Sequence, residues 1–206
     1  MNLPDAREEV MALMQALEEE PHHVRHVAAL ALQLFDELED LHGLDNQDRF
    51  ILEAASLLHD IGWCVSPDGS GHHRESARLI REHGWKHFDQ AAVTLMAQVA
   101  RYHRKSPPDL EHEEYAALSP AERHRVQQLA ALLRLADGLD RGHQRHVAGV
   151  SVEILPDSLL LRLHSTHPCS REVASATKKS DLAAAVFHRP VTFALVLESK
   201  ASGARE

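Results

Sequence analysis

The sequence predicts a mainly α protein in which a helical bundle is followed by a small α+β annex. Apolar residues make up 44% of the 206 residues but aromatic residues only 4%, so the core must consist largely of Leu, Ala and Val, which favours helices. Apolar residues recur at helical spacing up to about residue 146, and strand-like segments follow. We therefore expect a helical domain over residues 1–146, the annex over 147–198 and a flexible tail over 199–206.

Helix-breaking and helix-capping residues divide the first domain into six expected helices. Pro21 breaks the first helix and Gly62 stops the third. Ser119 is expected to cap the last helix, with Pro120 at its first position and Glu122 completing a capping box. The expected helices cover residues 4–20, 22–41, 47–61, 72–83, 89–102 and 120–139, and the polar segments 63–71 and 104–118 connect their neighbours.

The annex is expected to begin with a β-hairpin. Residues 147–155 and 159–164 are strand-like and are joined by the turn sequence Pro156-Asp157-Ser158. A helix over residues 171–186 and a third strand over 191–197 complete the expected annex.

Charge and composition exclude several classes of protein. The net charge is −9, whereas a protein that binds nucleic acid through its phosphates is normally basic. The two cysteines, Cys64 and Cys169, lie far apart and form no CxxC motif, so we expect no disulfide framework and a cytoplasmic location. No apolar run is long enough to span a membrane, and the acidic N-terminal segment does not resemble a signal peptide.

The doublet His59-Asp60 is the main candidate for chemistry. It ends an apolar helical stretch in a chain that contains 17 histidines. Imidazole and carboxylate groups together form the ligand set of hard or borderline divalent cations. The doublet therefore indicates a metal site in the bundle.

The doublet and its surroundings resemble the HD superfamily of metal-dependent phosphohydrolases. The pattern of that superfamily is a His four residues before a Val-Ala pair, then a His-Asp doublet, then a distant Asp. Val27-Ala28 places the first ligand at His23, and the last corresponds to Asp137. The resemblance implies that His23, His59, Asp60 and Asp137 surround one metal ion inside the bundle. Two other histidines on the same predicted helix compete with His23, namely His22 and His26.

The same resemblance implies a second set of metal ligands. Many HD proteins hold a second ion with one His at the start of the helix after the loop and another at the end of the next helix. The matching residues are either His72 or His73, together with His103. In that arrangement the carboxylate of Asp60 bridges the two ions.

Basic residues next to these positions are candidate ligands for phosphate. Arg101, Arg104 and Lys105 flank His103, and Arg134 precedes Asp137 by three residues on one helix face. Guanidinium and ammonium groups suit phosphate oxygens, although a basic helix end is also explained by the helix dipole. The candidate catalytic residues are Asp60, His103, Arg104 and Lys105.

A narrower resemblance covers nearly the whole chain. It is to the C-terminal region of the exopolyphosphatase/guanosine pentaphosphate phosphohydrolase (Ppx/GppA) family, in which a small α/β piece follows the HD bundle. The matching phrases are residues 27–35, 57–62, 72–76, 101–105 and 133–141. The polyphosphate-hydrolysing centre of that family lies in N-terminal actin-like domains without a counterpart in this sequence, so we do not expect exopolyphosphatase activity. Glu75 stands where the family usually has a His, which bears on the second metal ion.

These resemblances imply a metal-dependent phosphohydrolase that acts on a nucleotide or another small phosphate ester. The expected cofactor is one or two divalent ions from the set Mn, Fe, Mg, Co, Ni and Zn. The alternative is a non-catalytic nucleotide- or polyphosphate-binding or regulatory module that partners a separate exopolyphosphatase-type protein. A helical dimerisation domain is a third interpretation, and family members often work as homodimers.

Overall fold

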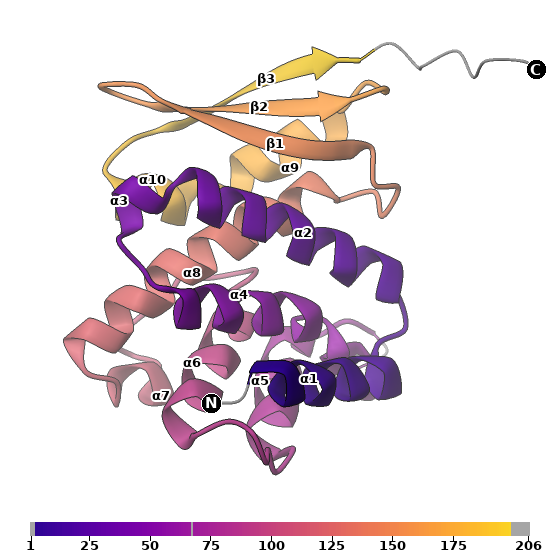
Figure 1. Ribbon diagram of the computed structural model, residues 1–206, viewed down its shortest axis with the longest axis vertical. Coiled ribbons are helices and arrows are strands. Elements are labelled where there is room, and N and C mark those ends of the chain that lie inside the picture. Colours follow the sequence, from indigo (N-terminus) through magenta and orange to yellow (C-terminus); the bar gives the residue numbers. More distant parts are fainter. Residues whose placement is uncertain (1–2, 67, 199–206) are drawn as a thin grey trace, which may run out of the picture.

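The computed structural model of the protein describes residues 3–66 and 68–198, and the fold is mainly α, as predicted (Figure 1). The bundle contains α1 (Leu3–Leu17), α2 (Pro21–Glu37), α3 (Glu39–His42), α4 (Asn46–Leu58), the short 3₁₀ helix η1 (Ile61–Val65), α5 (His72–Glu82), α6 (Gln90–Arg101), α7 (Glu113–Ala116) and α8 (Pro120–Leu139).

The annex is a three-stranded sheet with two helices. It consists of β1 (Val147–Ile154), β2 (Leu159–Ser165), α9 (Ser170–Lys179), α10 (Asp181–Phe187) and β3 (Val191–Leu197). The central strand β2 pairs with β1 in the antiparallel sense and with β3 in the parallel sense. The predicted hairpin is therefore confirmed, and the helices α9 and α10 form the crossover that a parallel neighbour requires.

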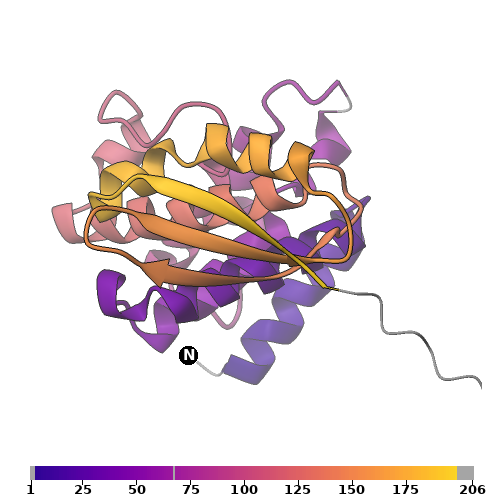
Figure 2. The same ribbon diagram turned by 90° about the horizontal axis from the view of Figure 1, so that it is seen from above.

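The annex packs directly on the bundle. Figures 1 and 2 show the sheet as an outer layer, and α9 and α10 contact α8 while β1 contacts α2. Buried apolar side chains of both parts form one cluster. The boundary at residue 146 is therefore a boundary in the type of secondary structure, and its role as a domain boundary stays a prediction.

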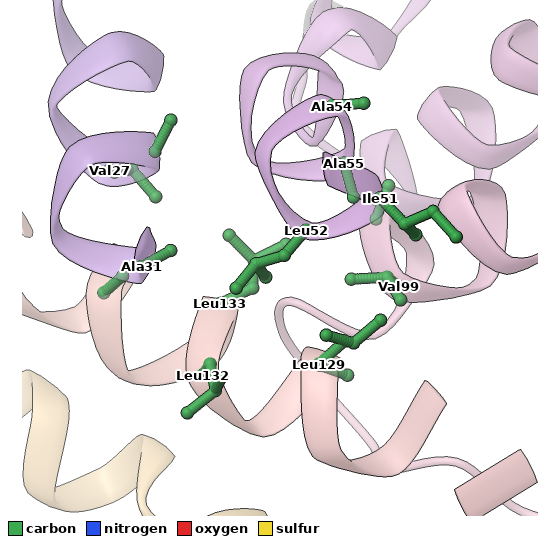
Figure 3. Close-up of a cluster of buried hydrophobic side chains, with 14 of the residues drawn as sticks. Val27, Ala31, Ile51, Leu52, Ala54, Ala55, Val99, Leu129, Leu132 and Leu133 are labelled. Atoms are coloured by element: carbon green, nitrogen blue, oxygen red, sulfur yellow. The ribbon is translucent and has the colours of Figure 1, made fainter. Parts of the chain in front are cut away.

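The bundle core is built from small and branched aliphatic side chains, as the composition predicts. Figure 3 shows part of it, where Val27 of α2, Leu52 of α4, Val99 of α6 and Leu133 of α8 lie in one interior. All four are fully buried. Close packing of this kind fixes the relative positions of the helices that hold the site.

Two helix ends near the site differ from the prediction. The first helix ends at Leu17, so Glu18 and Glu20 form a turn in which the Glu20 N–H donates to Glu18 Oε1 at 2.9 Å. Helix α4 ends at Leu58, and Asp60 has φ −109° and ψ 0° before η1 begins. The His-Asp doublet therefore lies at the junction between α4 and η1. The Asp60 side chain consequently does not have to point in the direction that a regular α-helix would impose.

Other differences lie farther from the doublet. The second expected helix is divided at Leu38 into α2 and α3, and the single helix expected over residues 171–186 is divided at Ser180 into α9 and α10. The connection over residues 104–118 contains the short α7. The predicted tail over 199–206 lies outside the described residues. Among the described helices, none combines the length and the apolar character needed to cross a membrane.

Candidate metal centre

The junction after α4 brings Asp60 against the start of α5. The Gly62 N–H donates to Ser76 Oγ at 2.9 Å, and a Cβ at Gly62 would lie 2.1 Å from the carbonyl oxygen of His72. Only glycine permits this approach. The close contact places His72 beside the His59-Asp60 doublet.

Three elements supply the first group of ligands. His23 comes from α2, the doublet from the end of α4, and Asp137 from α8. His23 Nε2 lies 4.0 Å from Asp60 Oδ2 and 3.7 Å from Asp137 Oδ1. His59 Nε2 lies 3.5 Å from Asp60 Oδ2. The four residues of the HD pattern are thus brought together.

A second group lies on the other oxygen of Asp60. Asp60 Oδ1 is 3.2 Å from His72 Nε2 and 3.4 Å from His103 Nε2. Asp60 therefore stands between two sets of imidazoles. Glu75 belongs to none of the metal-type clusters among the described residues, and its carboxylate accepts a hydrogen bond from Arg78 at 2.8 Å.

These separations suit metal ligands. Two atoms bound to one ion at about 2.1 Å lie about 3.0 Å apart at right angles and about 3.4 Å apart in a tetrahedron. The observed nitrogen–oxygen separations run from 3.2 to 4.0 Å. In three overlapping clusters, one candidate ligand atom from each residue lies within 4.8 Å of the others: His23, His59 and Asp60; His59, His103 and Asp137; and Asp60, His72 and His103.

The four imidazoles are held so that each presents Nε2 to the centre. In every case Nδ1 bonds to an oxygen behind the ring, and a carbonyl or carboxylate oxygen can only accept, so Nδ1 carries the proton. At His23, His59 and His103, Nε2 then keeps its lone pair for a metal, as is usual for metal-binding histidines, whereas at His72 this lone pair accepts from Arg104 Nη1 at 3.2 Å. The partners of Nδ1 are Asp140 Oδ2 at 2.9 Å for His23, Ser56 O at 2.7 Å for His59, Gly69 O at 3.2 Å for His72 and Ala100 O at 2.8 Å for His103.

Buried polar atoms without hydrogen-bond partners lie at the same candidate centre. His23 Nε2, His59 Nε2 and Asp60 Oδ1 are buried, and none forms a hydrogen bond with any described residue. Leaving a buried polar atom unpaired costs about 1–3 kcal/mol. A cation at this centre would satisfy all three atoms, so the donor set fits a divalent metal ion.

Lys179 also belongs to this centre, although no local pattern in the sequence indicates it. Its ammonium, at the end of α9, forms an ion pair with Asp137 Oδ2. Helix α9 can come this close because Gly138 has no side chain. A Cβ at that position would lie only 2.8 Å from Ala176 Cα. Burial alone would raise the pKa of Asp137, but Lys179 and the imidazoles of His103 and His59 together outweigh burial and hold that pKa below its usual value.

Glu18 is the second residue that the sequence did not single out. It lies in the turn after α1, and its Oε2 atom is buried and unpaired among the described residues. Burial raises the pKa of this carboxyl, partly offset by the hydrogen bond from the Glu20 N–H. Its only local signal is the run of three glutamates before Pro21.

A cavity of about 560 Å³ opens onto the centre. Asp60, His72, His103 and Asp137 line it, together with Trp63, whose ring stacks on His72 with centroids 4.4 Å apart. The charged residues of the remaining wall are Glu18, Glu19, Glu20, Arg104, Lys105, Arg141 and Lys179. The cavity therefore combines metal-type ligands with cationic groups.

The predicted phosphate-binding residues occupy different places. Arg104 and Lys105 line the cavity, and Arg104 Nη1 is 3.2 Å from His72 Nε2. Arg101 lies outside its lining and forms an ion pair with Glu114 at 3.2 Å.

Arg134 is buried beneath the segment that follows α6. Its guanidinium donates to the carbonyl oxygens of Tyr102 at 3.2 Å and Lys105 at 3.1 Å, and it pairs with Asp181 of α10 at 3.0 Å. The side chain is only 4% exposed. Its contacts hold the backbone that presents Arg104 and Lys105.

The histidines that competed for ligand positions lie elsewhere. His22 is exposed, and His26 Nε2 donates to Val147 O at 2.9 Å. His73 is buried but belongs to no described metal-type cluster. Burial and the charge of neighbouring cationic groups lower the pKa of His73 to about 4. The geometry thus distinguishes His23 and His72 from their neighbours.

Comparisons with known proteins identify the family of this chain. A comparison with curated proteins found no match. The family model of the Ppx/GppA phosphatase, domain III, matches residues 7–182, which include every residue of the three clusters. Because this match extends over most of the 206 residues, the chain belongs to the Ppx/GppA phosphatase domain III family.

Proposed function

We propose that this chain is an HD-type, metal-dependent phosphohydrolase that acts on a nucleotide or another small phosphate ester. The observation that supports this most strongly is the convergence of four imidazole Nε2 atoms on the two oxygens of Asp60, with each Nδ1 engaged behind its ring. Membership of a phosphatase family supports the same reaction class.

The donor set would hold one or two divalent ions. His23, His59, Asp60 and Asp137 would hold one ion, and Asp60, His72 and His103 would hold a second. Mixed imidazole and carboxylate ligands suit Mn, Fe, Mg, Co, Ni or Zn. When bound, such an ion lowers the pKa of a water molecule and polarises a phosphoryl oxygen.

The remaining groups would bind and orient the substrate. Arg104, Lys105 and Arg141 line the cavity and can donate hydrogen bonds to phosphate oxygens. The unpaired oxygen of Glu18 can accept a proton from the attacking water. Trp63 offers an aromatic wall beside His72.

Two linked measurements test this proposal. The metal content of purified protein is determined first, and phosphate release from a panel of nucleotides is then assayed with added Mn, Mg, Co or Ni. Bound metal with turnover that Asp60→Ala abolishes supports the proposal. Absence of metal at all added concentrations contradicts it.

One observation favours the second candidate, a non-catalytic nucleotide- or polyphosphate-binding module. The ammonium of Lys179 already neutralises Asp137, a carboxylate that a metal ion would use. Bound metal without turnover on any compound would favour this module. A cytoplasmic location, a homodimer and a separate exopolyphosphatase-type partner stay predictions from the sequence.

A further inference from the structure

A second cavity of about 600 Å³ lies next to the metal centre. It is lined by the loop over residues 68–71, the first turn of α5 and the segment that follows α6. Arg104 and Lys105 line both cavities, so these two side chains stand between the metal centre and the second cavity.

The lining of the second cavity is strongly cationic although the whole chain is acidic. Its cationic residues are Arg74, Arg101, Arg104 and Lys105, against one lining carboxylate, that of Asp68. Several cations around one cavity focus a positive potential in it. Such a lining suits an anion with several oxygen acceptors.

The N-terminus of α5 adds to this potential. Helix α5 spans 11 residues, and no side chain in the described part of the chain caps its start at Gly71, which has φ +79°. Gly71, His73 and Arg74 all line the cavity. The first N–H groups of a helix lack partners within it and carry the positive end of the helix dipole, a common site for phosphate.

His73 is an independent sign that a ligand belongs here. It lines the second cavity and is 9% exposed, and its Nδ1 atom has no hydrogen-bond partner among the described residues. Its neighbour His72 turns to the metal centre, with Nδ1 fixed by Gly69 O. A buried imidazole left unpaired among arginines is explained if a bound anion completes its hydrogen bonds.

We propose that the second cavity binds a phosphate group. The substrate of this chain would then carry two phosphate groups, one at the metal centre and one in the second cavity, with Arg104 and Lys105 between them. The statement about the substrate rests on the proposed function, whereas phosphate binding in the second cavity does not.

Calorimetry with inorganic pyrophosphate tests the site without metal or turnover. The full chain is titrated in EDTA as wild type, Arg74→Gln, Arg101→Gln and Arg141→Gln, because Arg141 lines only the first of the two cavities. The matched control is Arg78→Gln, because Arg78 lies one turn beyond Arg74 on α5, pairs with Glu75 and Glu82, and is outside the cavity lining.

We expect Arg74→Gln and Arg101→Gln each to raise the dissociation constant by about tenfold, since each removes one charge-assisted contact. Arg78→Gln should stay within about twofold of wild type. Arg101→Gln removes the Arg101–Glu114 ion pair and can therefore disturb the fold. Arg74 is exposed, so Arg74→Gln still tests the proposal in that case.

Two results would overturn the proposal. One is equal binding by Arg74→Gln and Arg78→Gln, and the other is a larger loss of pyrophosphate binding in Arg141→Gln than in Arg74→Gln, which would place the anion in the cavity at the metal centre. Absence of turnover would contradict the proposed phosphohydrolase and leave this binding unaffected, so the two failures are distinguishable.

Discussion

Lys179 of the annex forms an ion pair with Asp137 of the bundle at the edge of the candidate metal centre. The two residues are brought together by the close approach of α9 to Gly138 on α8. The annex therefore supplies a charged group to a site whose metal-type ligands all come from the bundle.

Removing this ammonium should strengthen metal binding. In Lys179→Met the Asp137 carboxylate is freed from its cationic partner, and a divalent ion no longer meets a like charge at close range. We expect the dissociation constant for Mn²⁺, measured by calorimetry, to fall several-fold. The control is Lys178→Met, because Lys178 is the exposed neighbour on α9. Weaker Mn²⁺ binding in Lys179→Met would show that the ammonium supports the metal site.

Asp140 should matter for metal binding although it belongs to no cluster. Its Oδ2 atom accepts from His23 Nδ1 at 2.9 Å, and its Oδ1 atom accepts from the Arg145 N–H at 2.7 Å, so the carboxylate fixes the orientation of His23. Loss of such a supporting group lowers metal affinity about 10–100-fold. We expect this for Asp140→Asn in a metal titration. Asp36→Asn, at an exposed carboxylate paired with Arg49, serves as the control, and equal affinities in the two variants would reject the role.

Arg134 should stabilise the folded protein. Arg134→Met leaves the Tyr102 and Lys105 carbonyl oxygens and Asp181 without their buried donor. We expect the free energy of unfolding to fall by about 2–4 kcal/mol in urea denaturation. A stable variant with only a weakened affinity for phosphate ligands would instead support a role of Arg134 in direct phosphate binding.

The metal-free protein should lose stability as the pH falls from about 6.5 toward 4. Burial and cationic neighbours lower the pKa of His73 to about 4, and burial holds the pKa of His103 well below its usual value. Histidines of the unfolded chain take up protons near pH 6.5, so protons favour unfolding in this range. Thermal unfolding in EDTA at pH 7.5, 6, 5 and 4 should show a falling midpoint, with a smaller fall in His73→Gln. Identical pH dependence of the two proteins would reject the contribution of His73.

Elements whose ends are set by local chemistry could be predicted from the sequence. Helix α8 covers the expected residues 120–139, because the capping box between Ser119 and Glu122 depends only on neighbours along the chain. The three annex strands also lie within one residue of their expected bounds. The prediction of one helix over residues 171–186 was wrong, since the break at Ser180 has no Gly or Pro signal. Asp181, the first residue of α10, pairs with Arg134, which is 47 residues away.

The residues of the site also divide into those that a local sequence pattern indicates and those that depend on long-range packing. His23, His59, Asp60 and Asp137 stand out because their spacing follows a known pattern, and the structure brings them together. Lys179 could not be found in this way, because its place depends on how α9 packs on α8. The parallel pairing of β2 with β3 is likewise a long-range contact without a local signature.

Metal content of the purified protein, compared with that of Asp60→Ala, tests the central claim most directly. Among the residues that the structure describes, Asp60 is the one whose two oxygens face both sets of imidazoles. We predict one or two bound divalent ions per wild-type chain and none in Asp60→Ala, with unchanged helical content by circular dichroism. An Asp60→Ala protein that keeps its metal, or a wild-type protein that binds none at any added concentration, would contradict the metal centre described above.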